Sequence, residues 1–201
     1  MSPASQELLR VISHSSRTVP PHEREAAALA TRLLQGLETR LAHSAAVAAG
    51  IDRVASLVEP EWRSALKDAA WLHDVGYNPE LALTGFHPLD GARWLRDHYW
   101  PDETCRLVAW HTEPLQEARL YGLDEQLTSE FDRPPRLAAA ALGWADLTSS
   151  PNGERWDAER RLADILDRYP PGSIVHQATR ASLPSLRESV REIEELLARA
   201  R

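Results

Sequence analysis

Six residues of two chemical types, spread over about a hundred positions, could together hold metal ions. They are four histidines and two aspartates that lie within or at the ends of apolar stretches: His43, His73, Asp74, His87, His111 and Asp146. A buried imidazole or carboxylate without a partner is costly or changes its pKa. A shared divalent cation would remove this cost for all six residues, so the sequence predicts a metal site.

The ligand types restrict the metal and its chemistry. Imidazole and carboxylate suit a first-row divalent ion, namely iron, manganese, zinc, nickel or cobalt, and do not make a thiolate site. Two imidazoles and one aspartate could serve each of two metals, with Asp74 as the bridge. Two adjacent cations can ionise a water, polarise a phosphoryl oxygen and stabilise a leaving group. A single metal on His43, His73, Asp74 and Asp146 remains the alternative.

The order of the ligands resembles a known family. His43 in RLAHS, His73 and Asp74 in WLHDVGY, and Asp146 in GWADLTS are similar to the motifs of the HD superfamily of metal-dependent phosphohydrolases. The resemblance covers about residues 38–150. It implies a helical domain that holds metal through these residues. We assign only packing roles to the segments before and after it.

The two remaining histidines resemble the additional ligands of binuclear HD branches. GFHPLDGARWL around His87 and LVAWHTE around His111 look like the added segments of hydrolases such as bacterial diadenosine tetraphosphate hydrolases. The Gly-Tyr of HDVGYNP stands in a different place from that of the HD-GYP phosphodiesterases. The myo-inositol oxygenase-like diiron enzymes share the ligand set. Purely structural roles, at a surface turn for His87 and at a helix end for His111, also remain open.

Other side chains could act beside the metal. Arg40 precedes His43 by three residues and therefore lies on the same helix face, where it could bind a phosphate or simply be exposed. Many HD hydrolases carry a lysine after the His-Asp pair, whereas Tyr77 follows here and could line the pocket. Asp90 could accept a hydrogen bond from an imidazole or lie at the surface.

Pocket walls and covers are also expected from the sequence. Thr148 and Ser149 could contact substrate or cap a helix break. Trp71, Trp110 and Trp144 could wall the pocket, although core packing is their default role. The loop 77–86 and the polar segment 122–134 could cover the site.

The spacing of apolar residues predicts an all-α fold. Helices are expected over 22–36, 38–49, 60–73, 88–99, 101–111, 135–147, 155–168 and 183–200. Gly36, Gly50 and Gly76 are predicted to end the first three. Residues 122–134 are polar and turn-rich. We expect one domain over 1–201, an HD-type helical bundle with its core at about 38–150, on which an N-terminal arm (1–37) and C-terminal helices (155–201) pack.

Composition restricts the partners. The chain has 201 residues, 43% of them hydrophobic, and a formal net charge of −7, which argues against a nucleic-acid-binding surface. Residues 1–20 lack the pattern of a signal peptide, and no stretch is apolar enough for a membrane span. Cys105 is the single cysteine, which fits a reducing compartment. We therefore expect a cytoplasmic protein, and a homodimer is compatible with these features.

The sequence predicts a metal-dependent phosphohydrolase of a phosphate ester or anhydride, with a small phosphorylated molecule, in particular a nucleotide, as substrate. His73, Asp74 and Arg40 are the expected catalytic residues. Two alternatives stay open. One is a diiron oxygenase of the same superfamily, and the other is a non-catalytic, metal-stabilised interaction or sensor module that docks through its last helix.

Overall fold

The computed structural model describes residues 21–200. Within this range the chain forms ten α-helices and three short 3-10 helices, with no strand beyond one isolated bridge between Ser149 and Arg155. The predicted all-α class is confirmed. Residues 1–20, which hold most of the expected N-terminal arm and the segment searched for a signal peptide, lie outside the described residues.

The helices are, in chain order, α2 (Pro21–Leu33), α3 (Glu38–Val54), α4 (Arg63–Leu72), α5 (His87–Asp97), α6 (Asp102–Ala109), α7 (Leu115–Tyr121), α8 (Asp124–Glu130), α9 (Arg136–Leu147), α10 (Ala158–Arg168) and α11 (Ile174–Arg199). The 3-10 helices are η1 (Ala55–Leu57), η2 (Pro60–Trp62) and η3 (Val75–Tyr77). Most of the predicted segments therefore form helices close to their expected bounds.

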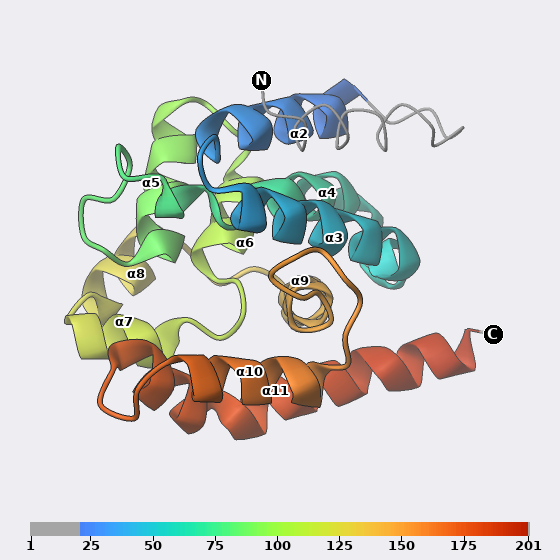
Figure 1. Cartoon of the computed structure of the whole chain (residues 1–201). Helices are drawn as coiled ribbons and strands as arrows, with labels where there is room; N and C mark the ends of the chain where they lie inside the picture. The colour runs from blue at the N-terminus through green and yellow to red at the C-terminus, as the bar shows by residue number, and fades with distance from the viewer. Residues whose placement is uncertain (1–20, 201) are drawn as a thin grey trace.

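Helix α9 lies at the centre of the molecule. Figure 1 shows it end-on, with α3 and α4 above it and α10 and α11 below, and it contacts all four. Its sequence, RLAAAALGWADL, is apolar around most of its circumference, as expected for a helix enclosed by others. Because small alanine side chains let neighbouring helices approach, the last turn of α9 carries Asp146 into the interior.

Gly50 does not end its helix as predicted. Helix α3 continues through Gly50 to Val54. A Cβ atom at Gly50 would lie 3.2 Å from the Cβ of Ala145, in α9. The glycine therefore serves the close packing of α3 against α9 instead of a helix stop.

Gly76 also has a role different from the predicted one. Helix α4 already ends at Leu72, and Gly76 lies beyond it in η3. A Cβ atom there would lie 2.0 Å from the carbonyl oxygen of His87 and 2.8 Å from the backbone nitrogen of Gly91. Only glycine lets the first turn of α5 approach the end of α4 this closely, and this contact brings His87 to the His73-Asp74 pair.

Two segments differ from the sequence expectation. The turn-rich segment 122–134 contains helix α8, and α7, which was not predicted, precedes it; Gly122, with φ of 70°, separates the two. The last helix begins at Ile174 rather than near residue 183. At this start the side chain of Ser173 accepts a hydrogen bond from the backbone N–H of His176. Pro184 lies inside this helix.

The C-terminal helices lie along one side of the molecule. Helix α11 packs against α9 and α7, and α10 packs against α11. In Figure 1 the pair runs below α9, at the side opposite α2. No helix among residues 21–200 has the length and apolar character required to cross a membrane.

The close contact at Gly76 gives a test of the fold. Gly76→Ala should lower the free energy of unfolding by at least about 2 kcal/mol, because the methyl group meets backbone atoms that cannot move away. Urea denaturation followed by circular dichroism measures this change. Gly172→Ala is the control, since its Cβ would meet nothing within 4 Å. Equal stability of the two variants would contradict the packing role of Gly76.

Candidate metal centre

The six predicted ligands come together at one place in the fold. His43 lies in the middle of α3, His73 and Asp74 directly follow α4, His87 begins α5, His111 follows α6, and Asp146 lies in the last turn of α9. Four of the six are buried, and His87 and Asp146 are partly exposed. Five helices thus contribute, and most of the ligands stand at helix ends, where the chain can turn a polar side chain inward.

The residues form two adjacent groups. The first triad is His43, His73 and Asp146, and the second triad is Asp74, His87 and His111; in each, the candidate ligand atoms lie within 4.8 Å of one another. Each triad offers two imidazoles and one carboxylate. Asp74 stands between them, because its Oδ1 lies 3.5 Å from His73 Nε2 and 3.7 Å from His87 Nε2.

Backbone carbonyl groups orient three of the four imidazoles. In each ring Nδ1 meets a carbonyl oxygen: Ser150 for His43 (3.1 Å), Ala70 for His73 (3.0 Å) and Val108 for His111 (2.6 Å). A carbonyl oxygen only accepts, so Nδ1 carries the proton and donates. Nε2 then faces the cluster. Metal-binding histidines are held in this way, with the second ring nitrogen bonded to an acceptor.

His73 shows most directly that the cluster fits a cation. Its Nε2 is buried and has no hydrogen-bond partner among the described residues. Burial lowers the pKa of His73 to about 4, so the ring is neutral at pH 7 and its contact with Asp74 is not an ion pair. Since Nδ1 holds the proton, Nε2 presents an unused lone pair, as a metal ligand does.

The second triad contains a close pair of nitrogen atoms. Nε2 of His87 and Nε2 of His111 lie 3.1 Å apart. The pKa of His87 lies well below its usual value. Burial is the largest cause, and the neighbouring His111 is the second. Because His111 donates through Nδ1, its Nε2 is an acceptor, and the pair needs either a proton from His87 or a shared cation.

In the first triad two of the members form a hydrogen bond with each other. His43 Nε2 lies 2.9 Å from Asp146 Oδ1. Burial alone would lower the pKa of His43, but the hydrogen bond and charge of Asp146 outweigh burial and raise it. The other carboxylate oxygen of Asp146 accepts a 2.5 Å hydrogen bond from Thr112 Oγ1. A cation bound at His43 Nε2 would replace the proton that this nitrogen shares with Asp146, so metal affinity should fall as the pH falls.

Arg40 connects the centre to an aromatic stack. Its guanidinium donates to Asp74 Oδ2 at 3.2 Å and lies 3.7 Å above the ring of Tyr77, which stacks on His87 at 3.9 Å. Burial alone would raise the pKa of Asp74, but His73 and Arg40 lower it strongly. Arg40 and Tyr77 both line the cavity over the ligands, as the sequence suggested.

Three polar residues that could have acted at the site bond to the backbone instead. Asp90 accepts hydrogen bonds from Thr84 and Gly85, so it fastens the loop before α5 instead of orienting an imidazole. The hydroxyl groups of Thr148 and Ser149 bond to carbonyl groups of α9. These two side chains end the helix and do not line the cavity.

The expected walls and cover are only partly correct. Trp71, Trp110 and Trp144 belong to the hydrophobic core, and none of them lines the cavity over the ligands. Within the loop 77–86, Tyr77 lines this cavity, whereas the segment 122–134 contributes no residue to it.

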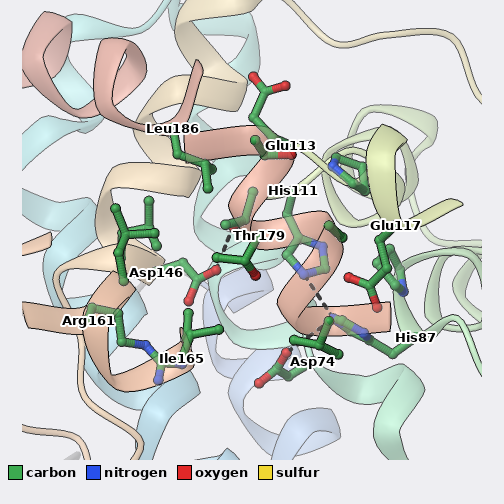
Figure 2. A pocket seen from close by; sticks show the side chains of 18 of the residues that line it. Asp74, His87, His111, Glu113, Glu117, Asp146, Arg161, Ile165, Thr179 and Leu186 are labelled. Atoms are coloured by element: carbon green, nitrogen blue, oxygen red, sulfur yellow. Dashed lines mark hydrogen bonds and ion pairs between the residues drawn. The ribbon is translucent and has the colours of Figure 1, made fainter. Parts of the chain in front are cut away.

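The C-terminal helices form a wall of the cavity that we did not predict from the sequence. Their lining residues include Arg161, Ile165, Arg168, Tyr169, Thr179 and Ser182. Figure 2 shows Arg161 and Asp146 at one end of the cavity and His87 and Glu117 at the other, with Ile165 and Thr179 between them. The assignment of only packing roles to these helices was therefore wrong.

A short strained segment and the helix α7 that follows it each add a carboxyl group to the cavity lining. Thr112 and Glu113 have positive φ angles of 54° and 56°, a conformation that non-glycine residues rarely adopt and that often occurs at functional sites. Glu113 and Glu117 both line the cavity. Burial raises the pKa of Glu117 to about 7, so this carboxyl group can exist in either form near neutral pH.

The two triads predict two divalent ions per chain. Protein incubated with Mn²⁺ and freed of unbound metal should retain two ions by elemental analysis, and His111→Ala should retain one. His98→Ala is the matched control, because His98 is exposed and stacks on Trp94 away from the cluster. A wild-type chain that retains one ion would exclude a binuclear centre.

Glu117 predicts a pH-dependent difference in stability. Its pKa is near 4.5 in the unfolded chain and about 7 in the folded chain, so ionisation costs folding energy as the pH rises from 4.5 to 7. In chelator-treated protein, Glu117→Gln should be more stable than wild type by about 3 kcal/mol at pH 8, with little difference at pH 4.5. Urea denaturation at several pH values measures the trend, and a pH-independent difference would contradict it.

Known proteins give no independent assignment. No protein-family model, curated protein or solved structure matches this chain. The resemblance to the HD superfamily thus depends on the motif residues alone. The inference that the protein binds metal depends on the two His/Asp triads.

Proposed function

We propose that this chain is an HD-type, metal-dependent phosphohydrolase that cleaves a phosphate ester or anhydride, with nucleotides as the expected substrates. The observation that carries the proposal is the position of two three-ligand groups beside a cavity that three arginines also line. Iron, manganese, zinc, nickel or cobalt would suit the ligands.

The charges around the cavity favour an anionic substrate. Arg40, Arg161 and Arg168 are opposed by four carboxyl groups, those of Asp74, Glu113, Glu117 and Asp146. Without metal these opposite charges nearly cancel, so the cavity alone would attract a phosphate only weakly. Two divalent cations would make the cavity strongly positive, and protonation of Glu117 would add to this effect. Substrate binding and metal binding are consequently coupled in the proposed enzyme.

The residues of the chain would divide the work. A divalent cation at the triads supplies Lewis acidity and lowers the pKa of a water molecule. Arg40, beside Asp74, binds a phosphoryl oxygen and neutralises the charge that develops on it. A water molecule that has lost a proton to the solvent would then form a bond to phosphorus while the bond to the leaving oxygen breaks. Glu117, with its pKa near neutrality, can give the leaving oxygen its proton.

The first alternative is oxidative chemistry at the same ligands. A diiron oxygenase would use the same imidazoles and carboxylates, but the three arginines of the cavity favour a phosphorylated substrate over a neutral one. Oxygen consumption together with an iron-to-iron charge-transfer band would support the oxygenase.

The second alternative is a non-catalytic module that metal stabilises. Helix α11 would be its docking surface. In that case the metal-loaded protein would turn over none of the tested substrates, although it would still retain its ions.

A nucleotide panel tests the proposal. Purified protein with Mn²⁺ should release phosphate from at least one nucleotide, and chelation should abolish the release. Asp74→Ala should lower the rate by at least about a hundredfold, because the carboxylate between the triads is lost. His98→Ala should keep the wild-type rate. Activity that survives in Asp74→Ala would refute the proposed centre.

A further inference from the structure

We propose that Arg161, on α10, binds a second phosphate group of the substrate, beside the first triad. This rests on the proposed function and narrows its substrate class from any phosphate compound to those with two adjacent phosphates, namely phosphoanhydrides. The inference concerns a helix outside the segment that resembles the HD superfamily.

The guanidinium of Arg161 is buried and only partly satisfied. The residue is 7% exposed, and its Nη1 donates to Asp164 at 3.1 Å. Its Nε is buried and has no hydrogen-bond partner among the described residues. A buried N–H group without an acceptor is unfavourable. Asp164 therefore satisfies only part of the donor capacity of this guanidinium.

Arg161 faces the cavity beside the first triad. It lines the cavity together with Asp146 and His43, and Figure 2 shows it close to the Asp146 end. Arg161 is therefore placed beside the first triad by geometry.

Arg40 occupies the other side of the centre. It contacts Asp74 of the second triad and the ring of Tyr77. The two guanidinium groups thus flank the two triads, one at each. A phosphate that lies over the triads and meets Arg40 leaves Arg161 available for a neighbouring anion. Phosphates joined by an anhydride bond provide such a neighbour within the same molecule.

The surroundings of Arg161 suit a phosphate rather than a carboxylate of the protein. Asp164 holds Arg161 and also forms an ion pair with Arg168, which lines the same cavity. One carboxylate therefore serves two guanidinium groups and leaves a net positive charge on this wall. Thr179 and Ser182, from α11, add hydroxyl groups to the same cavity. Arginine and hydroxyl donors together are typical of phosphate recognition.

Binding of two non-hydrolysable probes tests the proposal. Methylenediphosphonate carries two adjacent phosphonates, and methylphosphonate carries one. Calorimetric titration of Mn²⁺-loaded protein, freed of unbound metal, should show that Arg161→Gln weakens methylenediphosphonate binding about tenfold or more. Methylphosphonate binding should change less than about threefold, because that probe can bind without Arg161.

Two further variants make the outcome decisive. Arg160→Gln is the matched control, since Arg160 is exposed on the same helix and lies over the ring of Trp156. Arg161→Lys keeps the charge but loses the forked donor, so it should weaken methylenediphosphonate binding by a smaller factor than Arg161→Gln. This variant replaces Arg161→Gln in the test if Arg161→Gln does not fold. Equal losses for both probes, or no loss for either, would overturn the proposal.

These results do not depend on catalysis. If the protein hydrolyses no nucleotide but Arg161→Gln still discriminates between the probes, the anion subsite stands and the proposed hydrolysis fails. If hydrolysis occurs but both probes respond equally, the enzyme stands and the subsite fails.

Discussion

Burial of four imidazoles and two carboxylates in one small volume is the constraint on which the rest of the structure depends. Each group loses hydration, and desolvation is the largest influence on the pKa of His73, Asp74 and Asp146. The protein compensates by placing carbonyl acceptors beside three of the imidazoles and positively charged or hydrogen-bonding groups beside the two carboxylates. His73 still has an unused nitrogen. The protein atoms alone therefore satisfy the cluster incompletely, and a cation would complete it.

The close approach of helices brings the ligands into reach of one another. Gly50 lets α3 lie against Ala145, so His43 on α3 meets Asp146 on α9. Gly76 lets the first turn of α5 lie against the end of α4, so His87 reaches the His73-Asp74 pair. A methyl group at either position would separate a pair of ligand-bearing helices. Backbone spacing rather than side-chain flexibility thus sets the geometry of the centre.

The sequence predicts the ligands better than it predicts the helix ends. The six clustered residues, which are candidate ligands, could be found because histidine and aspartate are unusual in apolar segments, and that signal is local. The actual roles of Gly50 and Gly76 could not be found, because a glycine required by a neighbouring helix looks like a glycine that stops its own. Pro184 shows the reverse case, since α11 continues through a residue that normally breaks a helix.

The contribution of the C-terminal helices had a signal in the sequence that resemblance alone does not reveal. Ala158, Leu162 and Ile165 follow helical spacing on α10, and Arg161 stands among them. An arginine on an apolar face needs partners, and Asp164 supplies only part of what it needs. Since α10 and α11 also wall the cavity, a chain that ended near residue 150 would leave the triads open to water on that side. Water would weaken every charge interaction there, so these helices belong to the site as much as the ligands do.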